Sequence, residues 1–143
     1  MMNGIERSRR VLILIGMVLV IVVPFIINSN ADRNQINSAE RFCEDLENIV
    51  NKAISTSPYN ERRNIEQPDN IVSIMTQGVM IKVTYTRGGW FGEKREGEIT
   101  MDFSGTGIKD IELSGFMIGK GTYEIHVYQT PAQIIYIESN KIS

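Results

Sequence analysis

The sequence has a single cysteine, Cys43, and a single histidine, His126, among its 143 residues. One cysteine cannot form an intramolecular disulfide, so the fold depends on packing alone. One cysteine and one histidine without further ligands at metal-binding spacing do not make a zinc site. Neither residue lies in a motif for nucleophilic catalysis, phosphate binding or dinucleotide binding. The sequence therefore predicts no catalytic residue, no metal site and no cofactor, and we expect a protein that is not an enzyme.

Charge is absent from one long stretch and mild elsewhere. No charged residue lies between Val11 and Ile27. The chain has 15 basic and 17 acidic residues; residues 1–28 hold three arginines and one glutamate, which leaves 12 basic and 16 acidic residues and a net charge of -4 beyond residue 28. Without a basic patch, we expect no nucleic-acid partner.

The uncharged stretch from Val11 to Ile27 has the composition and flanks of a membrane-spanning helix. As a helix it is roughly 25 Å long, near the lower limit for a bilayer core of about 30 Å. Three arginines precede it, at positions 7, 9 and 10, which favours a cytoplasmic N-terminus and an extracytoplasmic remainder. We interpret residues 1–10 as a basic cytoplasmic leader and 11–28 as a transmembrane helix in contact with membrane lipid. Pro24 is expected to kink it.

A cleavable secretory signal is the alternative interpretation of the same stretch. An arginine-rich flank, an apolar run and the small residues Ser29-Asn30-Ala31 fit its three-part pattern, with a mature chain starting at Asp32. The apolar run is longer than the usual 7 to 15 residues of such signals, which favours a retained anchor. Both interpretations place the following domain outside the cytoplasm.

Residues 29–56 are predicted to form an amphipathic stalk helix, with its periodic part from about 33 to 55. Apolar residues recur there at spacings of three and four, and charged residues occupy the other face. Cys43 lies on the apolar face and is therefore expected to be a small buried side chain. The dipeptide Ser57-Pro58 ends the helix. The apolar face consists of Ile36, Ala39, Phe42, Cys43, Leu46, Ile49, Val50, Ala53 and Ile54.

Residues 57–143 are predicted to form an extracytoplasmic antiparallel β domain, which makes the fold class α+β. From Ile71 onward, six short segments rich in β-branched and aromatic residues alternate with glycine-containing turns. They form either one sheet under the helix or a small sandwich. Two segments alternate clearly and predict buried faces, and a third places His126 on a solvent face with Glu124 and Tyr128. The buried faces are Ile81, Val83 and Tyr85, and Ile99, Met101 and Phe103.

This order of parts resembles the archaeal type IV pilin-like proteins, which include minor pilins and membrane-anchored accessory proteins of surface filaments. The resemblance covers nearly the whole chain and is most suggestive in "LENIVNKAISTSPYNERRNIEQPDNIVSI" and "GTYEIHVYQTPAQIIYI". It implies a pilin-like fold, a place at the cell surface, and other pilin-like subunits or envelope proteins as partners. One feature differs from the family: Gly4 and Glu6 both precede the basic run, and no acidic residue lies in the apolar run. This difference argues against a major filament subunit.

The remaining distinctive stretch is "TRGGWFGEKREGE", residues 86–98, which contains the only tryptophan, Trp90, beside Phe91. Aromatic pairs on loops dominate many interfaces, so these two residues are candidates for contact with a partner. Alternatively, Trp90 folds back and closes one end of the β core. Two functions follow: a membrane-anchored structural protein of a surface filament, or an anchored or secreted module that binds a surface glycan or envelope protein through this loop.

Overall fold

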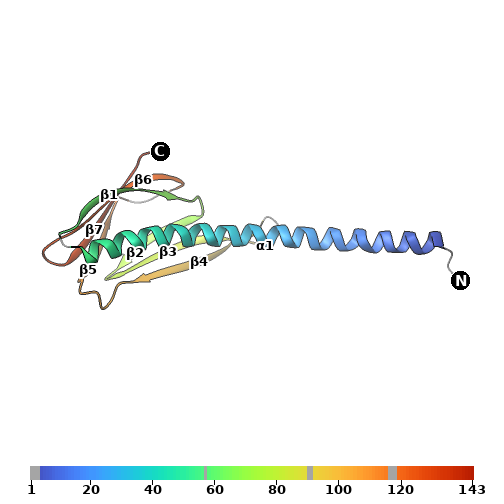
Figure 1. The fold of residues 1–143 in the computed structure, drawn as a ribbon, viewed down its shortest axis with the longest axis horizontal. Coiled ribbons are helices and arrows are strands. Elements are labelled where there is room, and N and C mark those ends of the chain that lie inside the picture. Colours follow the sequence, from blue (N-terminus) through green and yellow to red (C-terminus); the bar gives the residue numbers. More distant parts are fainter. Residues whose placement is uncertain (1–3, 57, 90–91, 116–118) are drawn as a thin grey trace.

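The computed structural model describes residues 4–56, 58–89, 92–115 and 119–143, and within them it has one long helix followed by seven strands. The C-terminal half of the helix, α1, lies against the strands, and its N-terminal half projects beyond them (Figure 1). This arrangement confirms the α+β class. The elements are α1 (Gly4–Ser55), β1 (Asn60–Gln67), β2 (Ile71–Gln77), β3 (Met80–Arg87), β4 (Arg95–Asp102), β5 (Asp110–Ser114), β6 (Gly121–Gln129) and β7 (Ile134–Lys141).

Helix α1 continues without a break through Pro24 (Figure 1). The predicted transmembrane and stalk segments are therefore two halves of one rod. Its end at Ser55 agrees with the prediction that Ser57-Pro58 stops it, because the residue before a proline is disfavoured in helical conformation. Only the C-terminal half contributes to the core, through one face. Its buried residues are Ala39, Phe42, Cys43, Leu46, Ile49, Val50 and Ala53.

The strands form two sheets, one with the order β1-β6-β7-β5 and one with the order β2-β3-β4. The expectation of purely antiparallel pairing is wrong for one pair, because β5 runs parallel to β7. The chain crosses from β5 to the far side of β7, forms β6 there and returns through a hairpin, so β7 has the same direction as β5.

Strand β1 is a strand that the sequence patterns missed. It pairs antiparallel with β6 along its whole length and forms the edge of its sheet. Only Ile65 and Gln67 are buried among the residues of "NERRNIEQ", so apolar alternation is almost absent there. An edge strand with one wet face needs few apolar residues, so the sequence patterns predict strands only from Ile71 onward.

The core lies between α1 and both sheets. The sheets meet where β2 and β5 lie side by side, and the Ile111 amide donates a 3.1 Å hydrogen bond to the Gly78 carbonyl. The architecture is thus two sheets sharing one helix, and not a single sheet under the helix. Ile81, Val83 and Tyr85 are all buried, as their alternation predicts.

Candidate functional site

The N-terminal half of α1 is an unburied apolar surface. Every large apolar side chain from Val11 to Ile27 is at least 42% exposed. An 18-residue window of this helix has a mean hydropathy of 3.0, and none of it is buried, so it is long and apolar enough to cross a membrane. A signal sequence passes the same test, whereas the core helix of a soluble protein is mostly buried. The exposed residues are Val11, Leu12, Ile13, Leu14, Ile15, Met17, Val18, Leu19, Val20, Ile21, Val22, Val23, Phe25, Ile26 and Ile27.

This surface is costly to leave in water. Fully burying one such side chain stabilises a protein by about 1.5 to 3 kcal/mol, so covering the whole half helix is worth more than about 10 kcal/mol. A typical domain has a total stability of about 5 to 15 kcal/mol. The free energy gained when lipid or a partner covers this segment is therefore comparable to the total stability of a domain.

Directly after the apolar run, an ion pair joins α1 to β3. The guanidinium of Arg87 donates to both oxygens of the Asp32 carboxylate, at 2.7 Å and 3.2 Å. This hydrogen bonding holds the pKa of Asp32 below its usual range, with the charges of Arg87 and Arg95 adding to it. Bidentate geometry fixes both the distance and the orientation of the two groups.

One helical turn further along, Asn70 makes a second connection. Its buried side-chain amide donates to the Gln35 carbonyl of α1 at 2.9 Å and to the Thr86 carbonyl of β3 at 3.1 Å. The Thr86 amide in turn donates to the Asn70 carbonyl at 2.8 Å. Asn70 thus links the helix and the end of strand β3 through backbone groups.

The loop between β3 and β4 lies against α1 at the same level. A Cβ atom added to Gly89 would overlap the side chain of Asn28 and lie 2.5 Å from the Asn28 carbonyl oxygen, so only glycine permits this approach. Trp90 and Phe91, the predicted partner contacts, lie outside the described residues. The described residues on either side of them lie beside α1 where its apolar run ends.

His126 lies on the outer face of the four-stranded sheet, with Tyr123, Ile125 and Val127 buried on the other face, as predicted. Its Nε2 atom is 2.6 Å from the Asn60 Oδ1 atom, and its Nδ1 atom is 3.3 Å from a Glu138 oxygen.

The Tyr128 hydroxyl donates to the same Glu138 carboxylate at 3.1 Å, which makes a cross-strand cluster with His126 on this face. Within the described ranges, no three His, Cys, Asp or Glu side chains are grouped so that they could hold a metal ion.

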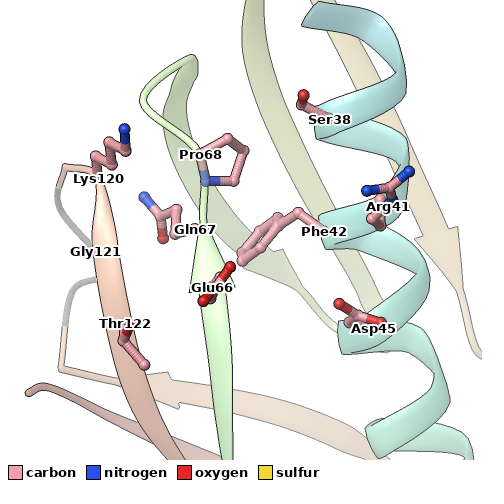
Figure 2. Close-up of a pocket in the computed structure, with 10 residues that line it drawn as sticks. All are labelled: Ser38, Arg41, Phe42, Asp45, Glu66, Gln67, Pro68, Lys120, Gly121 and Thr122. Atoms are coloured by element: carbon pink, nitrogen blue, oxygen red, sulfur yellow. The ribbon is translucent and has the colours of Figure 1, made fainter. Parts of the chain in front are cut away.

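Figure 2 shows a groove of about 380 Å³ between α1 and the adjoining ends of β1 and β6. Phe42 points from the helix toward Pro68 and Gln67 and forms its apolar part. Two cations and two anions, Arg41, Lys120, Asp45 and Glu66, line the polar part, so their charges balance. This groove has no preference for a ligand of one sign.

Sequence patterns located the apolar half helix but missed the residues that attach it to the β domain. Asp32, Asn70 and Arg87 are ordinary polar residues in the sequence. The two residues of the ion pair are 55 positions apart, and Asn70 is 35 positions from the residue of α1 that it contacts. No local pattern predicts such pairs.

No protein-family model, curated protein or solved structure matches this chain. Its function is therefore inferred from the geometry of the chain itself.

Proposed function

We propose that this chain is a single-pass membrane protein that presents a pilin-like β domain outside the cell, as a minor subunit or accessory of a surface filament. The observation that carries the proposal is the unburied apolar half of α1, which continues directly into the helix face that forms the domain core. The resemblance in the order of parts supports the pilin-like assignment.

The orientation follows from the charges beside the apolar run. Arg7, Arg9 and Arg10 precede it and are all exposed on the helix, which favours a cytoplasmic N-terminus. The β domain then lies on the opposite side of the membrane. Asp32 and Asn70, which attach the domain to α1, lie on that same side.

The same surface suits two environments, because lipid tails and the apolar faces of other helices are similarly apolar. Removal of α1 from lipid into a bundle of such helices would keep its side chains covered. Since Asp32–Arg87 and Asn70 fix the β domain to the helix, the arrangement of the helices in a bundle would determine the arrangement of the domains.

Cysteine cross-linking in cells tests the assembly. A Val18→Cys variant places a thiol in the middle of the exposed apolar run, and Ser104→Cys places one at an exposed turn of the β domain. We expect Val18→Cys to form cross-links between copies or to neighbouring subunits in a sheared filament fraction, and Ser104→Cys to form far fewer. Filaments that lack this protein, isolated from cells that express it, would contradict the proposal.

Membrane insertion is tested separately, with the protein in its natural membrane. We expect it to resist extraction by alkaline carbonate, and a tag after Ser143 to be cleaved by protease added outside the cells. N-terminal sequencing of the mature protein then separates an anchor from a cleaved signal, since a start at Asp32 would remove the apolar run. Complete release by carbonate would contradict the membrane assignment.

A further inference from the structure

The β domain has no spacer between itself and the apolar run. Ile27 is the last residue of that run, and the next residue, Asn28, already packs against Gly89 of the β3–β4 loop. Phe25, which is 71% exposed, lines the same surface depression as Gly88 and Gly92. The loop thus begins at the height on the helix where the apolar run ends.

The described start of the loop, at the end of β3, is also held at that height. Asp32 and Arg87 form their bidentate pair four residues beyond Asn28, and Asn70 joins the Gln35 carbonyl to the end of β3. These contacts lie within two helical turns of α1. They attach strand β3, which leads into the loop, to the helix. Movement of the loop away from the membrane would require breaking them.

The length of the apolar run decides where this height lies relative to the bilayer. Seventeen residues span roughly 25 Å, which is about 5 Å less than a hydrocarbon core of about 30 Å. The polar layer on each side of that core is roughly 5 to 8 Å thick. A short span is accommodated by local thinning and by drawing flanking residues into the polar layer. Asn28 and the loop beside it therefore fall inside this layer.

We propose that the described ends of the β3–β4 loop, residues 88–89 and 92–94, together with Arg95 at the start of β4, form a contact surface for the phospholipid headgroup layer. Lys94 and Arg95 are both exposed there and supply cations for lipid phosphates. The Asp32 carboxylate, which lines the same depression as Arg95, is paired with Arg87. Glu93 and Glu96 are also exposed beside the two cations and balance their charge, so the contact depends on height first and on the two cations second. This inference rests on the proposed membrane anchoring.

Nitroxide labels in the full-length protein, reconstituted in vesicles of phosphatidylcholine and phosphatidylglycerol, test the position. The variants are Glu93→Cys in the loop, Val18→Cys in the apolar run and Ser104→Cys past the end of β4. Strand β4 runs away from the projecting half of α1 (Figure 1), and the native Cys43 is buried. We expect a water-soluble nickel chelate to relax the label at 93 several-fold less than the label at 104, and to leave the label at 18 unaffected.

The three labels separate the two proposals. Equal chelate accessibility at 93 and 104, with 18 protected, would overturn the headgroup contact while the anchor stands. Full accessibility at 18 would instead refute the membrane anchoring itself.

Charge variants test the two cations. In Lys94→Glu/Arg95→Glu, we expect the accessibility of the label at 93 to rise toward that of 104, whereas Lys109→Glu/Lys120→Glu should leave it unchanged. Lys94→Gln/Arg95→Gln, which removes the charges without adding repulsion, should give a smaller rise. If the accessibility of the label at 93 stays the same in both loop variants, the assignment of Lys94 and Arg95 to lipid phosphates is wrong.

Discussion

At the scale of single residues, Cys43 illustrates how completely the C-terminal half of α1 is covered. The side chain is 3% exposed, and burial raises the pKa of its thiol to about 12, with the nearby carboxylates of Glu47 and Glu40 adding to the shift. A thiolate is the reactive form of cysteine, so this group is chemically inert in the folded protein.

We therefore expect the native protein to react with a thiol reagent at about pH 8 on the order of a hundredfold more slowly than the same protein in denaturant. Ser104→Cys, which adds an exposed thiol, should react quickly while Cys43 remains protected. Rapid labelling of Cys43 without denaturant would show that the helix does not stay packed on the sheets.

Asp32 is the residue whose ionisation should affect the attachment of α1 to β3. Its pKa is lowered in the folded state by the Arg87 hydrogen bonds, so its contribution to stability is present above the ordinary carboxyl pKa of 3.8 and is lost as the pH falls through the lowered value. Because the pair is partly exposed, we expect Asp32→Asn to lower the free energy of unfolding by on the order of 1 kcal/mol at about pH 7.

The measurement is thermal unfolding of the detergent-solubilised protein, followed by near-UV circular dichroism. The difference between Asp32→Asn and the unsubstituted protein should shrink as the pH falls below 3.8, and it should disappear once the pH lies below the lowered pKa of Asp32, where both carry a neutral side chain at position 32. A constant difference across this range would mean that the carboxylate charge does not stabilise the pair.

At the scale of elements, the C-terminal half of α1 has one buried face and one solvent-exposed face. Leu46 is fully buried between the sheets, whereas its neighbour Glu47 lies on the wet face of α1. Replacing a buried leucine with alanine typically costs 2 to 5 kcal/mol, and exposed substitutions usually cost less than about 0.5 kcal/mol.

We expect Leu46→Ala to lower the stability of the β domain by about 3 kcal/mol and Glu47→Ala to leave it nearly unchanged, by the same unfolding measurement. Similar losses in the two variants would contradict the packing of this helix face.

At the scale of the whole molecule, the apolar half of α1 adds no buried side chain to the core of the β domain, and Asn28 beside Gly89 is a contact at its surface. The first buried residue of α1 is Ala39, and the apolar run buries none of its side chains in the domain. Removal of residues 1–28 therefore takes away no core contact.

We expect residues 29–143 to fold as a water-soluble domain with native near-UV circular dichroism and to be released from lipid vesicles by alkaline carbonate. Sedimentation in aqueous buffer should show a monomer, since the surface that requires cover is gone. An unfolded fragment would show that the apolar half has a role in the fold that this arrangement does not contain.

The elements with a local and repeated pattern could be predicted from the sequence. The apolar run, the spacing of three and four from Ile36 to Ile54, and the alternation around Ile81 and Ile99 each report burial over several adjacent residues. Such periodicity follows from helix and strand geometry alone, so it could be interpreted without knowing the partners.

The other features depend on contacts between residues that are distant in the sequence. Strand β1 is defined by its pairing with β6, the parallel pairing of β5 with β7 by the chain's crossover, and the attachment of α1 by Asp32, Asn70 and Arg87. In each case the stabilising partner is distant in sequence, and a polar residue carries no sign of which distant group it will contact. The height of the β3–β4 loop beside Asn28 is such a feature, and it places the β domain directly against the end of the apolar run.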